Sequence, residues 1–473
     1  MERKPVLSDI LAERYASSEM VKIWSPERKI VLERELWIAI LKAQRDLGRA
    51  IPESAIQSYE QAVDHIDLAS IAARELKLQQ DVKARIEEFN ALAGGLELIH
   101  AGMTSRDDTD NVEQFQIHQS LKLVLNRTVA VLARLARRAM EYQTLDICGR
   151  THNVPAQTTT LGKRFAMFAE ELLCPFERLE TLISSYPFRG IKGAVGTQQD
   201  MTDLLGSARN AGALEDAILK HLGIERIFIA VGQVYPRSLD FEVVATLAQL
   251  ASAPANCAKT IRLMAGLGLM HEGFKEGQTG STAMPHKMNS RTCERINALM
   301  IILGGFLEMT KCLLGDQWNE GDVSCSAVRR IALPGAFFAL DGIYESILTV
   351  LDEMEIFPAM IKRELETYLP FLSSSRILMA AVKTGMPREQ THEIIKRHAT
   401  ESLREGTPET FIDRLARDTD FPLDRETISE LVAKPDHGRA VEQTVDVFNI
   451  ISGYVFNKYS DVAIYKYKPE PIR

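Results

Sequence analysis

The feature that most constrains the fold is a long segment, residues 111–142, that contains neither proline nor glycine. Such a segment is long for a helix of a globular protein. Apolar side chains recur along it at steps of three and four residues, namely Val112, Phe115, Leu121, Val124, Leu125, Leu132 and Leu135. This period places them on one face of an α-helix. The sequence therefore predicts a fold built around long helices.

Three further segments have a similar length and apolar period. They are residues 240–266, with Pro254 as an expected kink, and residues 290–314 and 334–354. Alternating β-branched segments with hairpin turns are nearly absent, so we expect an all-α protein. Broad apolar faces on helices of this length suggest a bundle that buries surface between subunits as well as within one subunit.

The chain of 473 residues is too long for one compact core, so two or three domains are expected. The length of the expected helices changes near residue 110, where they become longer, and again near residue 365, where they become shorter. We expect an N-terminal helical domain at residues 1–110, a central long-helix bundle at residues 111–365, and a C-terminal helical domain at residues 366–473. The last domain should contain short charged helices broken by glycine and proline.

Composition disfavours several classes of function. The net charge is −8 and no basic tract is present, which argues against nucleic acid, although a few arginines in a cleft can still bind a small anion. No membrane span or secretory signal is recognisable, so the six scattered cysteines are expected to be reduced thiols in the cytoplasm. Neither an HExxH motif nor paired His/Cys spacing occurs, so we expect no metal and no cofactor.

A glycine-flanked loop, residues 280–289, reads Gly-Ser-Thr-Ala-Met-Pro-His-Lys-Met-Asn. Gly273, Gly277 and Gly280 lead into it, and this density of glycine is costly in backbone entropy unless the segment moves or takes unusual dihedral angles. We expect a loop that closes over a substrate. The order of residue types resembles the signature loop of the fumarase/aspartase lyase superfamily, with Thr282 in place of the second serine.

Two further polar clusters lie just before expected helices. His152 stands among hydroxyls and amides in residues 150–164, where it is either a packed cap or a general acid or base. Thr104 and Ser105 are natural helix-start residues, and the same groups also form a receptor for a carboxylate or phosphate. Both clusters resemble segments of the same superfamily, where the second contacts the dicarboxylate part of the substrate. The resemblance implies a homotetramer in which three chains contribute to each active site.

The opening of the chain, with Arg14 and Tyr15, resembles the branch of this superfamily that cleaves adenylosuccinate, where the pair meets the nucleotide phosphate. Judged from their side-chain types alone, the two residues could equally be an exposed pair on the surface. The resemblance extends over nearly the whole chain. It implies β-elimination of fumarate from adenylosuccinate and from a succinyl-carboxamide ribotide. The substrate-binding residues that it implies are Arg14, Tyr15, Asp81, Thr104, Ser105, Thr151, Gln233, Asn289, Arg295, Ser326 and Arg330.

The same resemblance implies the catalytic residues Ser281, His152, Lys287 and Glu294. Ser281 is then the base that removes a carbon-bound proton, and His152 is the acid that protonates the departing nitrogen. Lys287 and Asn289 supply donors that stabilise the developing negative charge. Glu294 either pairs with His152 or is an ordinary surface acid. From residue chemistry alone, His286 is an alternative base, because its ordinary pKa of about 6.5 suits proton abstraction better than a hydroxyl.

Two positions depart from the superfamily's pattern. Gln80 stands where a histidine is usual, and Gly321 stands where an arginine is usual. Phosphate binding is then expected to depend on the guanidinium groups of Arg14, Arg295, Arg330 and Arg329. Two alternatives stay open: another lyase of the superfamily, acting on argininosuccinate, malate, aspartate or a carboxymuconate, and a helical scaffold that has lost its activity.

Overall fold

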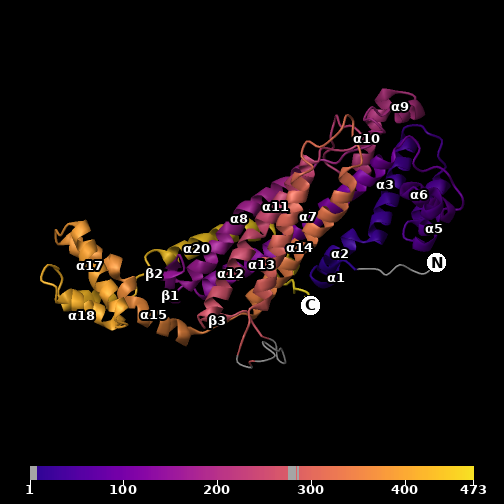
Figure 1. Ribbon diagram of the computed structural model, residues 1–473. Helices are drawn as coiled ribbons and strands as arrows, with labels where there is room; N and C mark the ends of the chain where they lie inside the picture. Colours follow the sequence, from indigo (N-terminus) through magenta and orange to yellow (C-terminus); the bar gives the residue numbers. More distant parts are fainter. Residues whose placement is uncertain (1–7, 275–283, 285–286, 473) are drawn as a thin grey trace.

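Long helices run along the middle of an elongated molecule, with groups of shorter helices at its two ends (Figure 1). The computed structural model describes residues 8–274, 284 and 287–472. The N-terminal helices are α1 Ile10–Arg14, α2 Ser18–Trp24, α3 Pro26–Asp46, α4 Glu53–Ala62, α5 Leu68–Leu78 and α6 Asp81–Leu92. Their own small core includes Trp37, Ile56 and Phe89. The expectation of an all-α protein is confirmed.

The middle of the chain forms the main bundle. Its helices are α7 Ser105–Glu141, α8 Leu161–Ser185, α9 Gln199–Leu205, α10 Ala208–Leu222, α11 Ser238–Leu250, α12 Ser252–Gly266, α13 Arg291–Lys311 and α14 Cys325–Glu353. Two short antiparallel strand pairs accompany them, namely the hairpin of β1 Asp146–Thr151 with β2 Val154–Thr160, and β3 Met270–His271 with the distant β4 Glu355–Ile356. The largest apolar core joins α7, α8 and α11–α14.

The C-terminal part forms a small helical group and then returns to the main bundle. Its elements are α15 Pro358–Leu372, α16 Ser374–Lys383, α17 Arg388–Arg404, a 3₁₀ turn Pro408–Thr410, α18 Phe411–Ala416, α19 Arg425–Ala433, α20 Ala440–Ile450, a π-helix Ile451–Phe456 and α21 Val462–Tyr465. Ile377, Phe411 and Ile428 belong to the core of this group. α20 packs on α8 and α7. The domain boundaries near residues 110 and 365 stay a prediction.

The two longest helices, α7 and α14, lie side by side and run in the same direction. At their N-terminal ends, Asp110 of α7 pairs with Arg329 of α14 (3.6 Å). At their C-terminal ends, the Arg134 Nε donates to the Asp352 carboxylate (2.9 Å). The 37 residues of α7 span about 55 Å at about 1.5 Å per residue. This length fixes how far apart the polar segments before and after α7 must lie.

Helix α14 is long and apolar enough to cross a membrane by composition alone. However, 89% of its most apolar window is buried inside the protein. Phe337, Leu340, Tyr344 and Ile347 are all fully buried in the main core. The apolar sequence of α14 is therefore explained by its central position in the bundle.

The expectation that hairpin turns are nearly absent missed the hairpin of β1 and β2. His152 and Asn153 form its two-residue turn, with φ of 51° and 62°. Two positive φ values are what a tight hairpin turn of this kind needs. Its strands are short and polar, so they lack the apolar alternation that marks a half-buried strand. His152 is thus a turn residue and does not cap α8, whose N-cap is Thr160.

Two predicted helices have different limits in the structure. Residues 240–266 form two helices, α11 and α12, separated at Ala251, so the expected kink is a break. Pro254 lies in the first turn of α12, and it has no N–H to donate to the carbonyl of Leu250. The helix expected from residue 334 begins at Cys325 instead, with Pro334 inside it. Burial of the surrounding side chains keeps α14 continuous there.

Two helical glycines should respond to alanine in opposite ways. A Cβ at Gly342 of α14 would lie 2.9 Å from the carbonyl oxygen of Tyr15, so Gly342→Ala should lower the free energy of unfolding by about 1–3 kcal/mol. The exposed Gly212 of α10 has open space at this position, so Gly212→Ala should raise it by about 0.5–1 kcal/mol. Urea unfolding at one protein concentration measures both. Equal effects would contradict the packing of Tyr15 on α14.

Candidate active site

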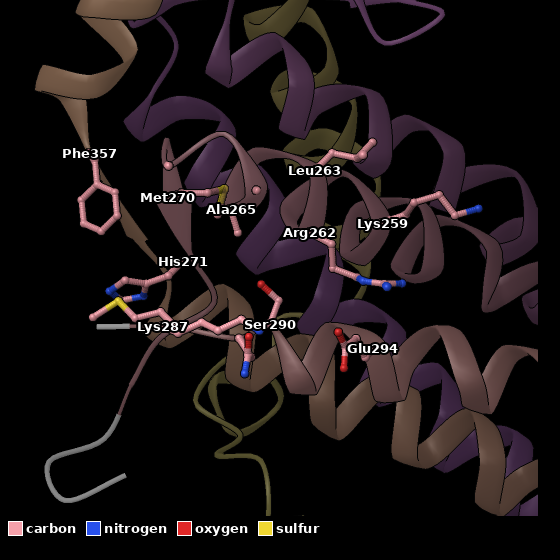
Figure 2. A pocket seen from close by; sticks show the side chains of 14 residues that line it. Lys259, Arg262, Leu263, Ala265, Met270, His271, Lys287, Ser290, Glu294 and Phe357 are labelled. Carbon is pink, nitrogen blue, oxygen red and sulfur yellow. The ribbon is translucent and has the colours of Figure 1, made fainter. Parts of the chain in front are cut away.

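The described end of the signature loop lines a cavity of about 720 Å³ beside α12 and α13 (Figure 2). Lys287, Asn289 and Glu294 all contribute to its wall. α12 contributes Lys259 and Arg262, and Figure 2 shows Arg262 and Glu294 on the same side of the cavity. Ser281 and His286 lie outside the described residues. The cavity therefore joins three of the predicted site residues with two cations that the sequence interpretation missed.

Glu272, which precedes the signature loop, is hydrogen-bonded to the start of α13, which follows the loop. This buried carboxylate follows β3 and accepts hydrogen bonds from the N–H groups of Thr292 and Cys293 (both 2.8 Å). These are free donors in the first turn of α13, where a negative charge is favoured. Gly273 has φ of 104°, and a Cβ there would collide with Glu353. The base of the loop is thus fixed on both sides.

Arg14 and Tyr15 lie on the middle of α14, together with Arg295 of α13. The guanidinium carbon of Arg295 is 5.6 Å from the centre of the Tyr15 ring. Burial lowers the pKa of the Arg295 guanidinium, and the nearby charges of Arg291 and Arg14 act in the same direction. Three cations that repel one another form a suitable receptor for an anion. The structure therefore brings Arg14, Tyr15 and Arg295 together.

A second group of predicted residues meets at the N-terminal ends of α6, α7 and α14. The side-chain amide of Gln80 donates to the hydroxyl of Ser105 (3.1 Å), and Arg330 lies 3.9 Å from the Asp81 carboxylate. Partial burial raises the pKa of Asp81, but the charges of Arg85 and Lys29 and the hydrogen bond from the Val82 N–H together outweigh this effect, so the net pKa is lowered. Gln80 therefore occupies the position where the superfamily usually has a histidine, and it makes a hydrogen bond without offering a titratable group.

Thr104 and Ser105 start α7, as the sequence predicts. The Thr104 N–H donates to the carboxylate of Asp107, three residues later (2.8 Å). The same carboxylate also accepts from the N–H groups of Lys192 and Gly193 (2.8 and 3.0 Å). This buried acceptor holds the start of the helix in place. It leaves the two hydroxyls partly exposed, where a ligand can reach them.

Gln233 and Ser326 lie near the loop that contains Gly321. The Gln233 N–H donates to the carbonyl of Glu320 (2.7 Å), and Ser326 is the second residue of α14. Gly321 has φ of 135°, a region that side chains with a Cβ rarely adopt. A Cβ there would also lie 3.0 Å from Val234. The backbone at this position is thus suited to glycine and disfavours the arginine of the superfamily's pattern.

The expectation that Arg329 helps to bind phosphate is wrong. Its side chain is buried and pairs with Glu113 (2.6 Å) and Asp240 (2.8 Å), and it donates to the Tyr235 hydroxyl (2.5 Å). A buried cation with this many partners neutralises the carboxylates around it and is not available to a ligand. Its partners lie far away in sequence, so residue spacing could not identify them. Arg330, the next residue, is 60% exposed.

His152 and Thr151 lie on the hairpin after α7, at the opposite end of this helix from Thr104 and Ser105. The hairpin is held by an ion pair between Arg150 and Glu364 of α15 (2.5 Å). Both His152 and Thr151 are exposed, and Thr151 lines a cavity of about 450 Å³ that does not include Glu294. Because α7 spans about 55 Å, Ser105 and His152 cannot meet within one chain. Their joint action would need a second copy.

Sequence analysis missed several residues of these cavities. Lys259 and Arg262 are three residues apart on α12, a spacing that places them on one helix face, but the segment was interpreted only by its apolar period. Buried His271 accepts from the Gly273 N–H (3.0 Å) and lies 3.1 Å from Glu355. Among the described residues, no group of three or more His, Cys, Asp or Glu side chains could hold a metal ion.

Comparison with known proteins gives matches over nearly the whole chain. A family model described as "Lyase" matches residues 5–303, and one described as "Adenylosuccinate lyase C-terminus" matches residues 370–448. The chain is 34% identical to adenylosuccinate lyase of Schistosoma mansoni over 469 residues, which covers 97% of this chain and 96% of that protein. It is also 34% identical to adenylosuccinate lyase of Saccharomyces cerevisiae over 446 residues, 92% of each chain.

Solved structures show the same fold at lower sequence identity. The crystal structure of a fumarate lyase from Mesorhizobium sp. BNC1 superposes with a TM-score of 0.79 and 21% identity. The match covers 94% of this chain and 99% of that one. At this level of identity the likeness concerns the fold.

Substitution of Arg329 should destabilise the protein far more than substitution of its neighbour Arg330. Arg329→Met removes the cation nearest to the buried Asp240 and to Glu113, so it should lower the free energy of unfolding by about 3–5 kcal/mol. Arg330→Met removes an exposed cation 3.9 Å from Asp81 and should cost less than about 1 kcal/mol. Denaturant unfolding of both variants is the measurement. Similar losses would show that the buried network has been assigned to the wrong arginine.

Proposed function

The chain belongs to the adenylosuccinate lyase family, and we propose that it cleaves adenylosuccinate to AMP and fumarate. It is a lyase. The proposal extends to the succinyl-carboxamide ribotide of purine biosynthesis, from which the same β-elimination releases fumarate. Similarity to named adenylosuccinate lyases over more than nine-tenths of both chains is the observation that carries the assignment. A cytoplasmic location and freedom from cofactors are part of the proposal.

The difficult step is removal of a proton from carbon next to a carboxylate. The resulting carbanion forms near neutral pH only if its extra negative charge is stabilised by cations and hydrogen-bond donors that are already in place. Lys287 and Asn289 line the same cavity as Arg262 and Lys259, which gives this region several donors. Such a site suits the dicarboxylate end of the substrate.

Proton transfer is assigned to Ser281 and His152. Ser281 is the base that takes the carbon-bound proton, and His152 is the acid that protonates the departing nitrogen. Glu294 is proposed to pair with His152 and to fix its tautomer. Glu294 lines the signature-loop cavity and His152 does not, and we propose that the two residues of this pair come from different subunits. His286 is the alternative base.

The remaining substrate-binding residues divide into two groups. Arg14, Tyr15 and Arg295 are already adjacent and are proposed to bind the nucleotide phosphate. The second group lies at the far end of the bundle, where Thr104 and Ser105 are proposed to contact the dicarboxylate and Arg330 the phosphate, and it consists of Asp81, Thr104, Ser105, Gln233, Ser326 and Arg330. Thr151 would act together with His152.

We propose a homotetramer with shared active sites. α7 holds the helix-start group and the His152 hairpin at opposite ends of the bundle, so a site that uses both needs more than one chain. Apolar side chains on α13 supply a surface for association, since Ile301 is 77% exposed and Ile302 is 39% exposed. The adjacent Gly304 and Gly305 leave open space, which permits close approach of another helix. These features favour association of identical chains through the main bundle.

Fumarate release from each candidate substrate tests the proposed function. Purified protein should release fumarate and AMP from adenylosuccinate and should leave argininosuccinate, malate, aspartate and carboxymuconate unchanged. A spectrophotometric assay follows the reaction, and chromatography identifies the nucleotide product. Activity on another of these substrates would assign the chain to a different lyase reaction. Failure with all of them would favour a scaffold without activity.

Ser281→Ala should lower kcat for adenylosuccinate by at least about 100- to 10,000-fold, because the proton acceptor is lost. The variant should remain folded and should still bind adenylosuccinate in calorimetry. His286→Ala is the matched comparison, because it removes the alternative base from the same loop, and it should keep a much larger share of the activity. Near-normal turnover in Ser281→Ala, or a larger loss in His286→Ala, would refute the base assignment.

A further inference from the structure

The chain ends in an extended strap, residues 466–472, that is fastened to the middle of the main bundle. The Tyr467 hydroxyl donates to one oxygen of the Glu345 carboxylate (2.7 Å), and the Glu470 N–H donates to the other oxygen (2.6 Å). Glu345 belongs to α14 and is fully buried. The guanidinium of Arg127 lies 3.3 Å from the centre of the Tyr467 ring. Because two groups of the strap donate to this buried carboxylate, the strap has a defined position on the bundle.

The strap is also tied to the segment that contains Arg14 and Tyr15. The carboxylate of Glu470 accepts from both the N–H (3.0 Å) and the hydroxyl (2.5 Å) of Ser18, the first residue of α2. Ser18 follows Tyr15 by three residues. The preceding N-cap, Ser17, is bound through its N–H to Asp341 of α14 (2.6 Å). The strap and the proposed phosphate-binding pair are therefore held by the same part of α14.

Lys468 lies between these two anchors and lines a cavity of about 800 Å³. Arg291 and Arg295 of α13 line the same cavity. None of these three cations makes an ion pair with another residue that the structure describes. Arg295 also faces the Tyr15 ring, so this residue connects the cavity wall with the proposed phosphate-binding pair. Three cations converge on one space next to Tyr15.

Two of the carboxylates that line this cavity, Glu272 and Asp352, make their hydrogen bonds and ion pairs with groups other than these three cations. Glu272 accepts from the N–H groups of Thr292 and Cys293. Asp352 pairs with Arg134 (2.9 Å) and Arg137 (2.8 Å) of α7. Converging cations without ion pairs repel one another, and a bound dianion would remove this repulsion. A phosphate group has the charge and the acceptor oxygens for such a site.

We propose that Lys468 and Arg291 bind the nucleotide phosphate beside Arg14, Tyr15 and Arg295. They take the place of the arginine that is missing at Gly321. The inference rests on the proposed function, because it names further residues for the phosphate end of that substrate. The need for further cations is greater because Arg329 is buried in its own ion-pair network. Lys468 owes its position to the anchors of the strap, which sequence spacing does not reveal.

The test compares a ligand that has the phosphate with one that lacks it. Calorimetry measures binding of AMP and of adenosine to the full-length protein and to its Lys468→Gln and Arg291→Gln variants. Each variant should bind AMP about 10-fold more weakly, as expected for loss of one charge-assisted contact, and adenosine within about 2-fold of the parent protein. KM for adenylosuccinate should rise about 10-fold with kcat nearly unchanged.

Two control variants separate phosphate binding from general effects. Lys466→Gln removes an exposed cation from the same strap outside the cavity and should leave AMP binding unchanged. Lys468→Arg keeps the charge and should restore most of the AMP affinity. Equal weakening of AMP and adenosine, or equal loss in Lys466→Gln and Lys468→Gln, would overturn the inference because it would indicate a structural or a long-range effect.

Failure of the inference and failure of the proposed function give different results. If the parent protein cleaves adenylosuccinate and both cavity variants bind AMP normally, only the inference is wrong. If the parent protein does not cleave adenylosuccinate, the proposed function is wrong, and the comparison of AMP with adenosine still decides whether the cavity binds a nucleotide phosphate. Absence of AMP binding by the parent protein would overturn the phosphate site.

Discussion

The fixed separation of the two ends of the main bundle determines how this protein can work. α7 and α14 are parallel, and ion pairs join them at both ends, through the buried pair Asp110 with Arg329 and through Arg134 with Asp352. A helix of 37 residues held in this way is a spacer of about 55 Å. The helix-start hydroxyls lie at one end of the spacer and the His152 hairpin at the other. A reaction that uses both requires more than one chain.

The arginines of this acidic protein fall into two groups, those paired with buried carboxylates and those that lie beside other cations. Arg189 and Arg329 are fully buried and are paired with carboxylates of α7 and α11, so they contribute to the stability of the bundle. Arg14, Arg291 and Arg295 lie together near Tyr15 and oppose one another's charge. A protein with net charge −8 can bind an anionic nucleotide where such cations are left without carboxylate partners. Position in the fold, more than residue type, decides which arginines are available.

The sequence was sufficient to predict the long helices and the polar segments, because apolar period and motif order are local properties. It failed where tertiary partners decide the outcome. The polar strands of the β1–β2 hairpin carry no apolar alternation, so the turn at His152 was missed. Arg329 was assigned to phosphate because Asp240 and Glu113, its buried partners, come from other helices. The position of Lys468 depends on Glu345, more than a hundred residues earlier.

Mixing two inactive variants tests the central claim most directly. Ser281→Ala and His152→Ala each lack one of the two proton-transfer groups, and each should be nearly inactive alone. After dissociation and reassociation of the mixture, some sites receive an intact loop from one chain and an intact hairpin from another, so part of the activity should return. Mass analysis of differently tagged chains verifies that subunits have exchanged. Verified exchange without any recovery of adenylosuccinate cleavage would contradict a site shared between subunits.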